Sequence, residues 1–74
     1  MSYVTSVTVV NNEGRPVAAE VFCGGTSKGF SDPDTGQIHF SMSSKDLYAV
    51  SARRQGASAS GEVRGGKAIV LRLR

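Results

Sequence analysis

Apolar and polar residues alternate with a period of two along almost the whole chain. No window of about eleven residues shows the apolar spacing i, i+3, i+4, i+7 that is typical of an amphipathic helix. A period of two places successive side chains on opposite faces of an extended strand. The pattern therefore predicts a chain that consists of strands and turns.

Seven strands are predicted, each bounded by turn-forming residues. They cover residues 3–10, 17–23, 26–31, 37–42, 47–53, 57–63 and 67–73. Pro16 is expected to mark the entrance of the second strand, because proline is tolerated at the first residue of a strand but not in its middle. The sixth strand is rich in small residues and is predicted to lie at a sheet edge.

Two turns have a clear chemical signature. Residues 32–36 read Asp-Pro-Asp-Thr-Gly, in which proline presets φ, aspartate caps locally and glycine takes the left-handed conformation. Gly65 and Gly66 stand between the last two strands, and a Gly-Gly pair is typical of a two-residue hairpin of type I′ or II′. The last two strands are therefore predicted to pair as a hairpin.

Short strands at regular spacing are typical of a β-sandwich or small barrel. The chain has 74 residues, which is room for one core, so residues 1–74 are expected to form a single domain. The expected fold class is all-β, a seven-stranded immunoglobulin-like Greek-key sandwich.

Three segments carry a resemblance to a known family. They are Asn12-Glu13-Gly14-Arg15-Pro16-Val17, the run from Asp32 to Phe40, and Leu47-Tyr48-Ala49-Val50-Ser51-Ala52. In this order they resemble the carboxypeptidase regulatory-like domains, over about residues 4–73. The resemblance implies a transthyretin-like (prealbumin-like) sandwich of the kind that recurs as an accessory module in bacterial and phage proteins. Before Leu47 the family often has a Pro-Gly turn, where this chain has Ser-Ser-Lys-Asp.

This chain lacks the reactive residues of two chemically active groups of relatives. Cna-B-like domains form an isopeptide between a first-strand lysine and a last-strand asparagine, and neither residue is present in those strands. Hydroxyisourate hydrolases use several histidines and a C-terminal Tyr-Arg-Gly-Ser, whereas this chain has one histidine and ends Leu-Arg-Leu-Arg. We therefore expect no enzyme activity of either type.

The remaining candidates for chemistry have simple structural interpretations. Cys23 shares its strand phase with Val21 and is expected to be buried, while His39 is expected to face outward, so the two are not predicted to form a catalytic pair. A single cysteine excludes an internal disulfide. The segment 32–36 is predicted to be a turn, not a calcium loop, and no metal or cofactor is expected.

The charge is uneven. The net charge is +3, and seven of the nine basic residues lie in the second half of the chain. They suggest a basic strip along the last strands, which we expect to protect an edge, meet an acidic protein or bind nucleic acid. Its predicted members are Arg53, Arg54, Arg64, Lys67, Arg72 and Arg74.

Apolar residues out of phase with the core are the second candidate for an interface. Phe22, Val10 and Val70 fall on outer faces if their strand neighbours face inward. The alternative is that a loop or terminus covers them.

These observations favour a non-catalytic interaction or structural accessory module, within a larger bacterial or phage assembly, that binds another protein. A homo-oligomer is open as well. The alternative is a small basic module that binds nucleic acid or another polyanion through the C-terminal strand and hairpin. The start of the chain lacks the basic and apolar regions of a signal peptide, and no apolar run is long enough to span a bilayer. We therefore expect a soluble protein, in the cytoplasm or in a secreted or virion assembly.

Overall fold

The computed structural model describes residues 2–74, and within them the chain forms strands and turns without a helix. The strands are β1 (Tyr3–Val10), β2 (Glu20–Cys23), β3 (Thr26–Phe30), β4 (Gln37–Met42), β5 (Leu47–Arg54), β6 (Ala57–Arg64) and β7 (Ala68–Arg72). The all-β prediction is confirmed, and most strand ends lie within one residue of their predicted positions.

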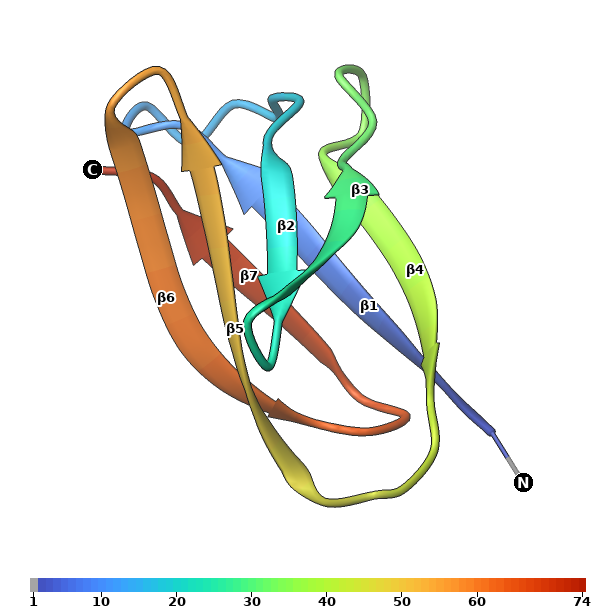
Figure 1. Cartoon of the computed structure of the whole chain (residues 1–74). Coiled ribbons are helices and arrows are strands. Elements are labelled where there is room, and N and C mark those ends of the chain that lie inside the picture. The colour runs from blue at the N-terminus through green and yellow to red at the C-terminus, as the bar shows by residue number, and fades with distance from the viewer. Residues whose placement is uncertain (1) are drawn as a thin grey trace.

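The strands form two sheets (Figure 1). One has the order β4-β1-β7, in which β1 pairs antiparallel with β4 and parallel with β7. The other has the order β3-β2-β5-β6 and is antiparallel throughout. The sixth strand lies at an edge, as predicted. This division differs from that of a constant-type immunoglobulin domain, in which the first, second, fourth and fifth strands share a sheet.

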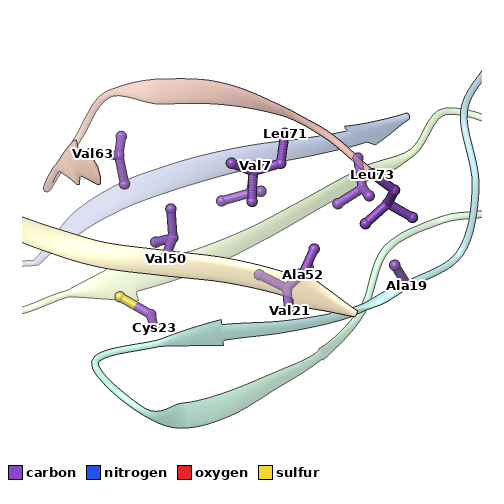
Figure 2. Close-up of a cluster of buried hydrophobic side chains, with 10 residues drawn as sticks. Val7, Ala19, Val21, Cys23, Val50, Ala52, Val63, Leu71 and Leu73 are labelled. Atoms are coloured by element: carbon purple, nitrogen blue, oxygen red, sulfur yellow. The ribbon is translucent and has the colours of Figure 1, made fainter. Parts of the chain in front are cut away.

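The core lies between the sheets and draws on both (Figure 2). Alternate residues point inward, so that β1 contributes Val7 and Val9 while β2 contributes Val21 and Cys23. The whole set of buried apolar residues is Val7, Val9, Ala19, Val21, Cys23, Val50, Ala52, Val63, Leu71 and Leu73. The period-two pattern of the sequence is therefore the pattern of burial.

The second strand begins at Glu20, three residues later than predicted. Residues 16–19 cross from one sheet to the other, so their hydrogen bonds are divided between both. Pro16 forms an isolated bridge with Val10, and the Val17 N–H donates to the Val9 carbonyl, 3.2 Å away. Ala19 is buried and Val17 packs against the core, but residues 17–19 belong to no ladder.

The Gly65-Gly66 turn does not make a hairpin, contrary to the prediction. The Lys67 N–H donates to the Arg64 carbonyl at 3.0 Å, and of the two glycines only Gly66 has a positive φ, of 85°. A positive φ at the second central residue alone marks a type II turn, which splays the flanking strands. β6 and β7 therefore enter different sheets. The buried Thr5 hydroxyl holds the turn by accepting the Gly66 N–H at 3.1 Å.

Ser31 ties the crossing segment to the end of β3. It is buried, and its Oγ accepts a hydrogen bond from the Ala19 N–H at 2.9 Å and donates one to the Val17 carbonyl at 2.7 Å. We predict that Ser31→Ala lowers the free energy of unfolding by about 1–3 kcal/mol, because it leaves buried backbone groups unpaired. Urea denaturation measures the change.

Ser41→Ala is the matched control, because Ser41 lies on the exposed face of β4. We expect this variant to unfold within about 0.5 kcal/mol of the wild type, as is usual for surface substitutions. Equal losses in the two variants would show that the buried Ser31 bridge contributes nothing.

Candidate functional site: a basic end

The structure divides the predicted basic strip between the two ends of the molecule. Arg53 and Arg54 lie at the end of β5, Arg72 ends β7 and Arg74 follows it. All four are exposed and lie at the end where the C-terminus approaches the β5–β6 turn (Figure 1). We call these four residues the basic end.

Arg64 and Lys67 lie at the opposite end. β6 runs antiparallel to β5, so that Arg64 pairs with Leu47, at the start of β5, and Arg54 pairs with Ala57. Lys67 follows the turn that leaves β6. Strand direction therefore separates these two residues from the other four, and the strip is not continuous.

Main-chain carbonyl groups position two guanidinium groups of the basic end. Arg54 Nη1 donates to the Ala18 carbonyl at 2.8 Å, and Arg72 Nη2 donates to the Asn12 carbonyl at 2.5 Å. A guanidinium has five N–H donors, so each keeps further donors for a ligand. These two arginines are thus held by the fold with their positive charge at the surface.

Arg74 is anchored through its backbone. It exchanges two hydrogen bonds with Ser58 of β6, at 3.1 and 3.2 Å. Sequence analysis did not single out Ser58, and no local signal marks it, because its role arises only when the edges of the two sheets meet.

Arg53 lies over the ring of Phe22, with 5.9 Å from its guanidinium carbon to the ring centroid. Phe22 is on the outer face of its sheet, as predicted, but it is only half-exposed. Glu20 pairs with Arg53 across the strands, and its carboxylate accepts the Ser27 hydroxyl at 2.9 Å. An aromatic ring therefore does accompany the basic residues, which the sequence interpretation did not anticipate.

Three hollows surround this end. The first lies between β6 and β7, the second around the β5–β6 turn, and the third beside the loop after β1. Together they are lined by Asn11, Asn12, Glu20, Arg53, Arg54, Gln55, Gly56, Ala57, Ser58, Ala59, Ser60, Val70, Leu71, Arg72, Leu73 and Arg74. Glu20 is the only acidic residue in this lining, so the hollows are electropositive.

The three predicted apolar candidates do not form one patch. Val10 and Val70 lie on the outer face of the β4-β1-β7 sheet, whereas Phe22 lies on the outer face of the other sheet. Val70 is 65% exposed, while Val10 is half-buried beside its register partner Arg72. These residues share the same phase in the sequence, but they lie on the outer faces of two different sheets, with the core between them.

The structure exposes three further large apolar residues that the sequence analysis did not single out. Phe30, Val4 and Leu47 are 69, 61 and 50% exposed. They belong to three different strands, and single exposed apolar residues are normal on a protein surface. We therefore base no site on them.

Cys23 and His39 are not brought together. Cys23 is buried, with its Sγ 3.9 Å from the Met42 Sδ, and Figure 2 shows it among the core side chains. His39 is exposed on the outer face of β4, where its Nδ1 lies 2.7 Å from the hydroxyl of its cross-strand partner Ser6. Both placements confirm the prediction.

The Asp32–Gly36 segment is a turn, as predicted. Asp32 Oδ1 accepts the N–H groups of Asp34 and Thr35, at 2.7 and 3.2 Å. Among residues 2–74 no group of three histidine, cysteine, aspartate or glutamate side chains is placed to share a metal ion, and none of these residues forms a helix that could cross a membrane.

Comparison with protein-family models, with curated proteins and with solved structures finds no match for this chain.

Burial raises the pKa of the Cys23 thiol, and the positive charge of Lys28 opposes this shift only in part. A raised pKa in the folded state means that the unfolded chain loses the thiol proton first as the pH rises. We therefore predict that the free energy of unfolding is unaffected by this group below about pH 8 and falls above the ordinary thiol pKa of about 8.5. Urea denaturation at a series of pH values, from below 8 up to about 9.5, measures the free energy of unfolding.

Cys23→Ala is the control for this titration. It lacks the ionisable group, so its free energy of unfolding should vary less with pH than that of the wild type over the same range. An identical pH dependence in both proteins would show that the thiol does not titrate differently in the folded and unfolded states.

Proposed function

We propose that this chain is a non-catalytic interaction or structural accessory module that binds an acidic surface of another protein through its basic end. The observation that carries the proposal is the convergence of Arg53, Arg54, Arg72 and Arg74 at one end of the molecule. Three of them lie in β5 and β7, strands of different sheets, and Arg74 follows β7. Only the fold gathers them.

The physical argument is electrostatic complementarity between preorganised groups. Arginine is enriched in protein interfaces, because its planar guanidinium can donate two parallel hydrogen bonds to a carboxylate. Arg54 and Arg72 are already positioned by main-chain carbonyls, so less side-chain entropy is lost on binding. An acidic partner would be attracted over a distance of about 10 Å at moderate salt.

The shape of the surface supports a macromolecular partner. Small-molecule sites are concave and lined mainly by apolar and aromatic side chains. The hollows of the basic end are instead lined mostly by polar, charged and small residues. Such a surface suits a protein that covers it better than a small ligand that enters it.

We further propose that the sandwich is of the transthyretin-like Greek-key type and that the chain belongs with the carboxypeptidase regulatory-like domains. Two features support the topology. β5 returns to lie beside β2, and β4 returns to lie beside β1. In a Greek key the fourth strand returns to lie beside the first of three consecutive strands, and here each such return belongs to a series of four strands that is divided between the two sheets. An accessory role in a larger bacterial or phage assembly follows from the same resemblance.

A nucleic acid or another polyanion is the second candidate, and the contact between Arg53 and Phe22 favours it. A guanidinium over an aromatic ring offers a flat surface against which a base can stack. The other aromatic contacts with cations lie elsewhere, between Lys28 and Phe40 and between Lys45 and Tyr3. A single stacking surface would bind single-stranded nucleic acid only weakly, so we place this function second.

Charge reversal at the two ends separates specific docking from general attraction. The test variant is Arg72→Glu with Arg74→Glu, and the control is Arg64→Glu with Lys67→Glu, which changes the net charge equally at the opposite end. We predict that the partner captured by cross-linking in extracts of the source cells is retained by the control and lost by the test variant. With that partner purified, the affinity should fall at least about tenfold, or 1.4 kcal/mol.

The same proteins are tested against a labelled 20-base single strand and a 20-base-pair duplex at 50 and 200 mM salt. Tight binding that weakens steeply with salt would support the polyanion function. If both variants bind every ligand as the wild type does, the basic end is not the docking surface and the proposed function is wrong.

A further inference from the structure

The third hollow of the basic end is smaller than the other two. Its volume is about 220 Å³, against about 430 and 440 Å³ for the hollow between β6 and β7 and the hollow around the β5–β6 turn. Pockets that enclose a drug-sized ligand usually measure about 300–1,000 Å³. The third hollow therefore has room for one functional group that projects from a larger molecule.

Four side chains that can donate hydrogen bonds line this hollow, and none of the described residues that line it is acidic. The four come from three segments, which meet where the C-terminus approaches the β5–β6 turn and the loop after β1 (Figure 1). Arg54 ends β5 and Gln55 follows it, Asn11 follows β1, and Arg74 comes after β7. Leu73, which is buried, forms part of the floor. Donors therefore surround the hollow on several sides.

The side chain of Asn11 is oriented as a donor. Its Oδ1 accepts the N–H groups of Glu13 and Arg15, at 2.8 and 3.0 Å. Its Nδ2, which carries two N–H donors, makes no hydrogen bond within residues 2–74. Because the oxygen is committed to the loop, these two donors are what Asn11 can offer a ligand.

The other three side chains also have donors to spare. Arg54 uses one of its five N–H groups on the Ala18 carbonyl. The side chains of Gln55 and Arg74 make no hydrogen bond within the described part of the chain. All four donor groups can therefore bind an acceptor in the hollow without breaking a contact of the fold.

Gln55 has the only positive φ among the non-glycine residues that the structure describes, at 48°. With Gly56, at 83°, it occupies the two central positions of a type I′ turn, where asparagine and glycine are favoured. A larger residue in this conformation costs backbone strain, and such residues cluster at ligand-binding sites. The strain supports a binding role for the Gln55 amide.

The charges around the hollow favour an anion. Asn12 also lines the hollow, and its carbonyl accepts a hydrogen bond from Arg72, which brings a third guanidinium close to this site. The next residue, Glu13, pairs with Arg15 at 4.0 Å, so a positive charge balances its carboxylate. The hollow therefore lies in a positive potential.

The arrangement of the donors suits a tetrahedral anion better than a planar one. A carboxylate holds its two oxygens in one plane, and a single guanidinium satisfies them with two parallel hydrogen bonds. A phosphomonoester has three terminal oxygens that point in different directions, and its charge at pH 7 is about −1.5 to −2. Donors on several sides of a hollow can bind these three oxygens at the same time.

We propose that the third hollow binds the phosphate group of a phosphorylated serine or threonine on the partner protein. This inference rests on the proposed function, because it names the group by which the acidic partner is recognised. Arginine clusters recognise phosphorylated segments in several kinds of binding domain. Arg53 and Arg72, which line the two larger hollows, remain for carboxylates that flank the phosphate in the partner.

The probe is the peptide acetyl-Gly-Ala-phosphoserine-Ala-Gly-amide, whose binding is measured by NMR titration. Two reference peptides carry glutamate or serine in place of phosphoserine. The phosphopeptide should bind at least about tenfold more tightly than the glutamate peptide, because of its larger charge and third oxygen. The side-chain amide signals of Asn11 and Gln55 should shift, while that of Gln37, on β4, should not. Inorganic phosphate should displace the phosphopeptide.

Asn11→Asp changes the hollow without changing the loop. One aspartate oxygen can accept the same two N–H groups, as Asp32 Oδ1 does from Asp34 and Thr35, while the other replaces the donor Nδ2 with a negative charge. We expect at least about tenfold weaker phosphopeptide binding. Gln37→Glu is the matched control, because it exchanges an amide for a carboxylate on an exposed residue that lines none of the three hollows. Its binding should stay within about twofold of the wild type.

Gln55→Gly removes a second donor without straining the turn. Glycine adopts a positive φ at no steric cost, so the variant should fold as the wild type does. Its binding of the phosphopeptide should weaken at least about threefold, because one hydrogen bond to a charged group is lost. Thermal unfolding and the same NMR titration measure the two properties separately.

Two outcomes would overturn the phosphate site and leave the proposed function standing. One is equal binding of the phosphoserine and glutamate peptides, which would show that the basic end recognises acidic residues in general. The other is binding that survives Asn11→Asp but is lost in the Arg72→Glu and Arg74→Glu variant, which would place the phosphate elsewhere on the basic end.

Three further outcomes would overturn the inference through the identity of the ligand. A dinucleotide that binds as tightly as the phosphopeptide would assign the hollow to nucleic acid. Inorganic phosphate that binds while the phosphopeptide does not would assign it to a free anion. If the phosphopeptide does not bind, the phosphate site is wrong, and the charge-reversal variants with the captured partner decide separately whether the proposed function is wrong as well.

Discussion

Contact between small, β-branched side chains from two facing sheets is the interaction on which the rest of this molecule depends. The largest side chains that are fully buried are Val7, Val9, Val21, Val50 and Thr5, and no aromatic ring is among them. Phe40 and Tyr48 only pack against this core from its margin. A chain of 74 residues buries about 60% of the surface that its unfolded form exposes. With so thin a core, each inward polar group needs a partner, as the Thr5 hydroxyl finds in the Gly66 N–H.

The small number of strands also explains why the sheets stay open along one side. A seven-stranded chain that divides into sheets of three and four strands has four edges, and short connections close only part of them. Ser58 and Arg74 link β6 to β7 at one end, while the splaying turn at Gly65 and Gly66 separates these strands at the other. The hollow between β6 and β7 thus lies beside the Ser58–Arg74 link, at the end of the molecule where β5 and β7 bring their arginines together.

Strand direction determines which charges gather. β5 and β7 both end at the same end of the molecule, and each carries arginines in its last residues or directly after them. β6 runs the other way and carries Arg64 to the opposite end. The six basic residues of the predicted strip therefore divide into two groups with different surroundings. The carbonyls of Ala18 and Asn12, residues far away in the sequence, hold the guanidinium groups of Arg54 and Arg72.

The alternation of apolar and polar residues by itself determined the strands, their inward faces, the burial of Cys23 and the outward direction of His39 and Phe22, because these depend on the backbone geometry of neighbouring residues. The small residues of the sixth strand indicated that it lies at an edge. The alternation could not show that residues 17–19 cross between sheets, that the Gly-Gly turn splays its strands, or that Arg64 and Lys67 leave the other arginines. A period of two specifies on which face of a sheet each side chain lies, but it does not specify which other strand pairs with that strand. Only the tertiary structure decided which edges meet, because pairing depends on contacts between residues that are distant along the chain.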